Sequence, residues 1–96
     1  MKFEWNIGKA ALNIKNHGVS FEEAEEAFFD EFSLDLFDES HSSLDEERFQ
    51  ILGLTSKNVL LVVYTLREAE TYRIISARKA TNPETAAYWN ERKKYE

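Results

Sequence analysis

Three strand-like segments follow one another closely in the second half of this 96-residue chain, at 47–54, 59–66 and 70–78. The connections between them span only residues 55–58 and 67–69. A parallel crossover needs about a dozen residues or more, so connections this short join antiparallel neighbours. The segments therefore predict an antiparallel meander. Its middle strand is apolar at nearly every position from 59 to 64, which indicates a central strand covered on both faces.

The N-terminal third of the chain predicts a short strand followed by two helices. Residues 1–5 alternate apolar and polar side chains, as a strand does. Asn6 is a suitable cap for a helix that ends near His17, because Gly18 readily adopts the conformation that often follows a helix. Ser20 and Glu23 have the spacing of a capping box, in which each side chain binds the other residue's backbone N–H. In this second helix we expect four glutamates to face outward and four residues to face inward: Phe21, Ala24, Ala27 and Phe28.

The rest of the chain completes an α+β domain. Residues 32–37 alternate like a half-buried strand, and residues 38–45 are polar like a loop. A last helix is expected to begin at Asn82, as the cap, with Pro83 at its first position. The predicted order is one strand, two helices, four strands and one helix, with helices packed on an antiparallel sheet. Residues 1–96 are expected to form a single domain.

Charge is unevenly distributed along the chain. The net charge is −6, from 12 basic and 18 acidic residues, and twelve of the acids lie between Ser20 and Glu47, where there is no Lys or Arg. The remaining residues carry six acids against all twelve bases, a local surplus of +6. This asymmetry indicates one surface for an anion and another for a cationic partner. The alternative is a solvated acidic face that only keeps the protein in solution.

Several functional classes are excluded by the residues that the chain lacks. It has no cysteine, so disulfides and thiolate sites are ruled out, and it has no glycine-rich phosphate loop or nucleophile elbow. Its two histidines, His17 and His41, are too few for most zinc sites. A divalent cation bound by the acidic loop at Asp38, Glu39 and Asp45 remains an alternative to simple solvation. No apolar run approaches the length of a membrane span, and we expect a soluble, cytoplasmic protein.

Arginines on predicted strands are the first candidate site residues. Arg73 and Arg78 are five residues apart on the last strand, so they point to opposite faces unless a bulge intervenes or one lies at the strand end. Arg48 lies on the first strand of the meander. An arginine within a sheet needs an anion. That anion is either an internal carboxylate, such as Glu4 or Glu47, or the phosphate of a substrate.

A stripe on the first helix offers groups that transfer protons. Lys9, Asn13 and His17 recur every four residues, on a different stripe from Ile7, Ala11 and Ile14. Histidine ordinarily titrates near neutral pH, and the negative end of the helix dipole favours its protonated form at position 17. His17 is therefore interpreted as a general acid or, alternatively, as a C-terminal capping residue without catalytic role.

These residue types suit RNA cleavage without a metal ion. The 2′-hydroxyl of RNA attacks the adjacent phosphate, so the substrate supplies the nucleophile. The protein has to orient the substrate, neutralise the phosphate with arginines and move protons with His, Lys or Tyr. Tyr64, Tyr72 and Trp89 are candidates to stack on bases, although aromatic residues on strands and helices are more often part of the core.

Several blocks of the sequence, in order, resemble the BrnT family of toxins. They are Phe3-Glu4-Trp5-Asn6, Lys9, Asn13, the block from His17 to Ala24, Glu47-Arg48-Phe49, Gly53, Val62 to Thr65, and Arg73 to Ala80. The resemblance extends over about residues 3–90. The blocks His-Gly-Val-Ser-Phe-Glu-Glu-Ala and Arg-Ile-Ile-Ser-Ala-Arg, at this separation, are its most specific part. Asn16 departs from the family pattern, which commonly has a basic residue before the histidine.

The resemblance implies a RelE-like fold and a metal-independent endoribonuclease of a type II toxin–antitoxin system, which arrests growth and needs no cofactor. It implies a BrnA-like ribbon-helix-helix antitoxin that forms a heterotetramer with the toxin, neutralises it and carries the contact to DNA. It also implies a set of functional residues. The catalytic candidates are Lys9, His17, Arg73 and Arg78, and the substrate-binding candidates are Arg48, Ser76 and Glu47. The competing hypothesis is a non-catalytic module that acts only by binding an antitoxin.

Overall fold

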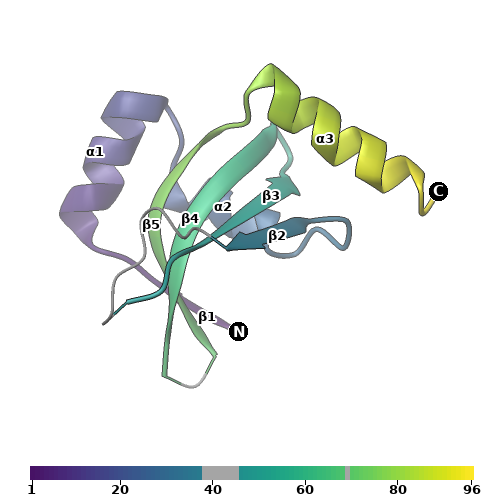
Figure 1. The fold of residues 1–96 in the computed structure, drawn as a ribbon. Helices are drawn as coiled ribbons and strands as arrows, with labels where there is room; N and C mark the ends of the chain where they lie inside the picture. The colour runs from purple at the N-terminus through teal and green to yellow at the C-terminus, as the bar shows by residue number, and fades with distance from the viewer. Residues whose placement is uncertain (38–45, 69) are drawn as a thin grey trace.

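The computed structural model describes residues 1–37, 46–68 and 70–96. Their elements follow the predicted order, as Figure 1 shows. The sheet contains β1 (Lys2–Glu4), β2 (Leu34–Phe37), β3 (Phe49–Leu54), β4 (Val59–Arg67) and β5 (Thr71–Lys79), and the helices are α1 (Ile7–His17), α2 (Phe21–Ala27) and α3 (Asn82–Lys93). None of these helices is both long and apolar enough to cross a membrane.

The five strands form one sheet in the order β1-β5-β4-β3-β2. The pairs from β2 to β5 are antiparallel, so the predicted meander is confirmed. β1 is the exception, because it runs parallel to β5 at the edge. β4 is central and mostly buried, as its apolar sequence predicts.

The core lies mainly on the face of the sheet that α1 and α2 cover. Residues from α2 pack there against Ile51, Leu60, Val62 and Ile74. Gly53 on β3 allows this close approach, since a Cβ atom at that position would lie 2.5 Å from the backbone oxygen of Ala27. On the other face, a smaller cluster under α3 surrounds Tyr88. α1 lies beside β5, and α3 extends from the end of β5 across one end of the sheet (Figure 1).

The predicted ends of the helices are mostly confirmed. Asn6 caps α1 through a 3.0 Å bond from the Lys9 N–H, and Gly18 ends that helix with φ 69°. The prediction for α3 was wrong by one residue, because Thr81 and not Asn82 is its cap. Thr81 and Glu84 form a complete capping box, which the sequence pattern Thr-x-x-Glu also allows.

The second helix departs from prediction at Glu23. Ser20 accepts the Glu23 N–H at 3.0 Å, which is half of the expected capping box. The Glu23 side chain is buried instead of facing outward, and its Oε2 has no hydrogen-bond partner within the described residues. β2 also begins two residues later than expected, because residues 31 and 32 form a turn in which Asp30 binds the Phe32 N–H.

Candidate active site

A bulge in β5 decides which side chains share a face of the sheet. Ser76 pairs with Val63, but Ile74 pairs with Tyr64, so Ile75 is the extra residue on β5. On either side of it, Arg73 lies opposite Thr65 and Arg78 opposite Leu61. Thr65 and Leu61 are four residues apart on β4 and therefore point to the same face, and so do the two arginines paired with them. Of the two arrangements that would allow both arginines to share a face, the structure contains the bulge.

The face that carries these arginines is the one opposite α1 and α2. The helix that covers part of it, α3, packs its buried Tyr88 against Leu52 and Leu61 at one end of the sheet. Ser76 lies opposite Val63, between Arg73 and Arg78, and is half-buried. The side chains of Arg48, Arg73 and Arg78 each keep about a third of their surface exposed, at 32%, 30% and 36%. We call this surface the arginine face, defined by Arg48, Arg73, Ser76 and Arg78.

Each arginine of this face contacts a carboxylate. Arg73 donates to Glu4 of β1 in a short bond, which is one of the internal partners that the sequence predicted. Arg48 donates through Nε to Glu46 at 3.3 Å, and the second Glu46 oxygen lies 4.0 Å from Arg67. Arg67 pairs with Thr71 and therefore lies on the same face as Arg73. Glu46 contacts both Arg67 and Arg48, so Arg48 belongs to this face too.

Arg78 forms a two-pronged pair with Glu84. Its two terminal nitrogens donate to the two oxygens of Glu84 at 2.7 and 3.0 Å. Glu84 also accepts the Thr81 N–H at 2.8 Å. The hydrogen bond from Arg78 is the main cause that lowers the pKa of Glu84 to about 2, and the same bond raises the pKa of Arg78. The pair fixes the guanidinium beside the start of α3.

Glu47 contributes backbone to the site. Its carbonyl accepts a hydrogen bond from the hydroxyl of Thr65 at 2.7 Å. Thr65 is the β4 residue that pairs with Arg73, so this bond holds the segment before β3 close to Arg73. Its side chain is exposed. This contact keeps the chain before Phe49 on the sheet and thereby holds Arg48 near the other arginines.

Lys9 and His17 lie apart from the arginine face, on α1. Both are exposed, and no hydrogen bond or ion pair of the described residues connects either side chain to the arginines. Between them, one turn from each, the buried Asn13 donates to the carbonyls of Val19 and Ala77 at 2.9 and 2.8 Å and accepts the Ala77 N–H at 3.1 Å. Asn13 thus pairs with the free edge of β5, and Lys9 and His17 lie along the same side of α1.

Asn13 is one residue whose structural role the sequence analysis missed. Its signal was present, since it belongs to the stripe of Lys9 and His17, but a single polar residue gives no sign that it will be buried. The apolar stripe Ile7, Ala11 and Ile14 is the exposed side of α1 instead.

Two of the three aromatic candidates for base stacking belong to the core. Tyr64 is buried and Tyr72 half-buried, and their rings contact Phe28 on the face covered by α2. Burial is the main cause that raises the pKa of Tyr64 to about 12, which makes it a poor proton donor or acceptor near neutral pH. Trp89 on α3 is exposed, at 38%.

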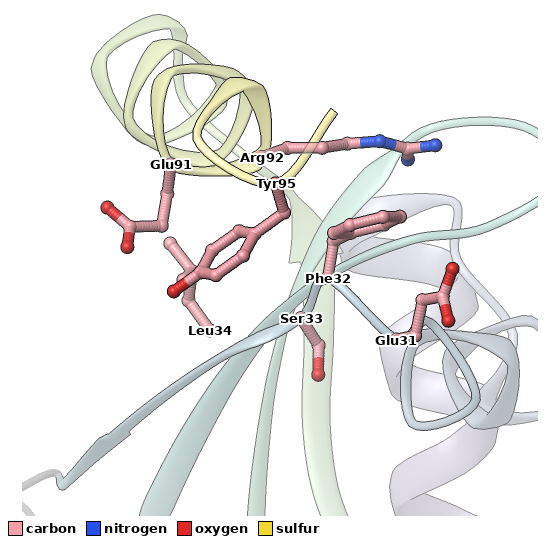
Figure 2. Close-up of a pocket in the computed structure, with 7 residues that line it drawn as sticks. All are labelled: Glu31, Phe32, Ser33, Leu34, Glu91, Arg92 and Tyr95. Carbon is pink, nitrogen blue, oxygen red and sulfur yellow. The ribbon is translucent and has the colours of Figure 1, made fainter.

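A pocket of about 450 Å³ lies between α3 and the segment that leads into β2. Figure 2 shows the Arg92 side chain extended above the ring of Phe32, and the guanidinium lies 4.5 Å from the ring centre. Arg92 also binds Glu96 and the hydroxyl of Tyr88. Glu31 and Glu91 line the same pocket. Two carboxylates and an arginine that is already bound make this pocket unsuited to a phosphate.

The candidate cation site at Asp38, Glu39 and Asp45 and the loop histidine His41 lie outside the described residues. Within the described ranges, no three His, Cys, Asp or Glu side chains gather as metal ligands would. The structure thus brings together Arg48, Arg73, Ser76 and Arg78 and places the Glu47 backbone beside them.

Comparison with known proteins gives the same fold. The crystal structure of the Brucella abortus ribonuclease toxin BrnT, determined at 1.1 Å, is similar with a TM-score of 0.65 and 22% identity, over 85% of this chain and 99% of that one. A search of curated proteins finds no match. Residues 5–84 match the family described as the ribonuclease toxin BrnT of type II toxin–antitoxin systems. Because the match extends over most of the sequence, this chain belongs to the BrnT family of ribonuclease toxins.

Proposed function

We propose that the chain is a metal-independent endoribonuclease whose catalytic surface is the arginine face. The observation that carries the proposal is the bulge at Ile75, which puts Arg73, Ser76 and Arg78 on one face of β5. A bulge is a conserved feature more often than a defect, and bulges commonly re-aim side chains next to active sites. Three partly exposed guanidinium groups on one open surface supply paired N–H donors for phosphate oxygens.

In the proposed reaction, the 2′-hydroxyl oxygen attacks the adjacent phosphorus and its proton passes to a general base. The bond from phosphorus to the 5′ oxygen breaks, and that oxygen takes a proton from a general acid. The products are a 2′,3′-cyclic phosphate and a free 5′-hydroxyl. The arginines stabilise the negative charge that develops on the phosphate oxygens, an effect that commonly contributes about 10²–10³-fold per donor. The Ser76 hydroxyl, between Arg73 and Arg78, contributes a further hydrogen bond to the phosphate.

We assign the proton transfers to His17 and Lys9. Both are exposed on the side of α1 that Asn13 attaches to β5, so substrate bound over the edge of β5 meets them on one side and Arg78 on the other. Four residues along a helix advance about 6 Å, so each lies about that far along the helix from Asn13. The role of His17 and Lys9 can be tested separately from that of the arginines, because neither side chain takes part in the described contacts of the arginine face.

The test is RNA cleavage by the purified chain in the presence of a chelator. The substrate is a single-stranded oligoribonucleotide, and the matched control is the same oligonucleotide with every ribose replaced by 2′-deoxyribose. We expect cleavage of the first only, with cyclic phosphate ends. Cleavage of the deoxy control, or loss of cleavage on chelation that added Mg²⁺ restores, would contradict the proposed chemistry.

We further propose that a BrnA-like ribbon-helix-helix antitoxin neutralises this single-domain toxin in the cytoplasm and forms a heterotetramer with it. A type II toxin implies an antitoxin. The charge pattern supports a basic partner segment, since residues 20–47 hold twelve acids and no base. Analytical ultracentrifugation of this chain mixed with a BrnA-like ribbon-helix-helix protein measures the mass of the complex. A heterodimer of one toxin and one antitoxin as the sole complex would exclude the heterotetramer.

A second candidate function, a non-catalytic antitoxin-binding module, is favoured by one observation. Arg48, Arg73 and Arg78 already contact internal carboxylates, so a substrate phosphate has to compete with them or bind to the remaining N–H donors. Induced expression separates the two functions. The ribonuclease arrests growth and its Arg73→Ala variant does not, whereas the binding module leaves growth unchanged in both cases.

A further inference from the structure

A groove of about 610 Å³ continues the arginine face toward the turn between β4 and β5. It is lined by Lys2, Glu4, Arg67, Glu68, Thr71 and Arg73. The pairing register explains why these residues meet. Lys2, Thr71 and Arg67 form one row across β1, β5 and β4, and Glu4 and Arg73 belong to the next row. Three strands therefore build the groove, and Arg73 is shared between it and the arginine face.

The charges in the groove favour an anion. Three cationic and two anionic side chains line it, in a chain whose net charge is −6. Glu4 and Arg73 neutralise each other in their ion pair, which leaves the cations Lys2 and Arg67 against the single carboxylate Glu68. The backbone N–H of Lys2 binds the Glu70 carbonyl, but the Lys2 side chain is exposed and forms no hydrogen bond or ion pair with another described residue. The Arg67 side chain is 50% exposed, and its contact with Glu46 is 4.0 Å long. Both cations can therefore turn toward a ligand at little cost.

The dimensions indicate a polymer. Thr71 and Arg78 lie opposite Arg67 and Leu61, which are six residues apart on β4, so the distance along the sheet is about 20 Å at roughly 3.3 Å per residue. A single nucleotide is too short to span that length. Lys2 and Arg67 lie at one end of this length and Arg78 at the other, and Arg73 lies between them, nearer the groove.

We propose that this groove is a second phosphate-binding subsite, which holds the RNA backbone through Lys2 and Arg67 on one side of the bond that is cleaved. The inference rests on the proposed ribonuclease function and adds its substrate class: single-stranded RNA several nucleotides long, held along β5 from the groove to Arg78. Lys2 and Arg67 bind and position the substrate and take no part in the chemical step.

The experiment compares the Lys2→Ala/Arg67→Ala double variant with a matched control, Lys15→Ala/Lys57→Ala. The control removes the same charge from exposed positions in α1 and in the turn between β3 and β4. Affinity is measured as a function of salt with a fluorescent 2′-O-methyl oligoribonucleotide, which lacks the attacking hydroxyl and therefore binds without being cut. Circular dichroism checks that both variants fold.

The groove variant is expected to bind roughly tenfold more weakly than the control at low salt. The slope of log Kd against log salt should fall by about 1.4, because each phosphate contact on a single strand contributes about 0.7. The cleavage rate at saturating RNA should match that of the control. Equal salt slopes for the two variants would overturn the subsite while leaving the ribonuclease function intact. Conversely, if the salt slopes of the two variants differ as predicted but the wild type does not cut RNA, the proposed function fails and the subsite stands.

Discussion

Replacing Glu84 with glutamine perturbs both the end of β5 and the start of α3. The carboxylate binds both terminal nitrogens of Arg78 and the Thr81 N–H. Glutamine keeps the size of the side chain but removes its charge and one acceptor oxygen. The variant therefore loses the two-pronged pair with Arg78 while the helix sequence remains otherwise unchanged.

The size of the effect follows from the pKa of Glu84, which the Arg78 pair lowers from 4.5 to about 2. At about 1.4 kcal/mol per pKa unit, that shift sets a ceiling of roughly 3.4 kcal/mol. The pair is partly exposed, with 36% of the Arg78 side chain and 28% of the Glu84 side chain accessible, so water screens much of it. We expect Glu84→Gln to lower the free energy of unfolding by about 1–2 kcal/mol near neutral pH.

The direction of the pKa shift determines how the stability difference between wild type and variant changes with pH. A carboxyl group whose pKa is lower in the folded state contributes its full stability above its unfolded pKa of 4.5, and loses it as pH falls through about 2. The difference between wild type and variant should thus be constant near neutral pH and shrink toward zero in acid. The assay is urea unfolding followed by circular dichroism across this range. Glu22→Gln is the control, because Glu22 is an exposed glutamate in the first turn of α2. If Glu84→Gln is no more destabilising than Glu22→Gln, or its cost persists at low pH, the reasoning is refuted.

Three further substitutions test the packing of the fold by urea unfolding. Gly53→Ala should lower the free energy of unfolding by about 1–3 kcal/mol or more, because its Cβ would lie 2.5 Å from the backbone oxygen of Ala27. The control Gly8→Ala, whose Cβ would meet only a side-chain oxygen at 3.1 Å, should be neutral or stabilising. Equal effects of the two substitutions would contradict this account. Asn13→Ala removes three buried hydrogen bonds and should cost about 2–4 kcal/mol, so a loss below about 1 kcal/mol would show that α1 does not depend on them. Tyr88→Phe removes the hydroxyl that joins Asp30 to α3 and should cost about 1–2 kcal/mol; an unchanged midpoint would mean that this bond contributes nothing.

The order and type of the elements were predictable because each depends on local chemistry. Short connections determined the meander. Asn6 and Ser20 mark helix starts because their side chains accept backbone N–H groups, and Gly18 marks a helix end because it adopts a positive φ. The parallel pairing of β1 with β5 was not predictable in this way, since it joins segments about seventy residues apart. No short-range pattern specifies such a contact.

The ionic partners of the predicted site residues were predictable in part, but their geometry was not. Arginines on strands need anions, and this alone indicated Glu4 as a partner. Glu84 was missed because the sequence pattern described it only as a helix residue, whereas it serves the Thr81 cap and Arg78 at once. A bulge was one of two predicted alternatives, but its position could not be predicted, because one inserted residue leaves no mark in a strand whose residues are half-buried on both faces.

Burial of polar side chains on α1 and α2 was the remaining failure. Asn13 and Glu23 are buried while Ile7 and Ile14 are exposed, the reverse of what residue type favours. Asn13 has an explanation, because it replaces a missing strand at the edge of β5. Nothing in the described contacts explains the burial of Glu23.

The central claim is that the arginine face carries out the cleavage. Its most direct test is the single-turnover rate at which the purified chain cuts a saturating oligoribonucleotide in the presence of a chelator, compared among wild type, Arg73→Ala, Arg78→Ala and the control Lys15→Ala. We predict that each arginine variant folds and cuts about 10²–10³-fold more slowly, while Lys15→Ala cuts at the wild-type rate. If folded Arg73→Ala and Arg78→Ala cut RNA as fast as the wild type, the arginine face is not the active site.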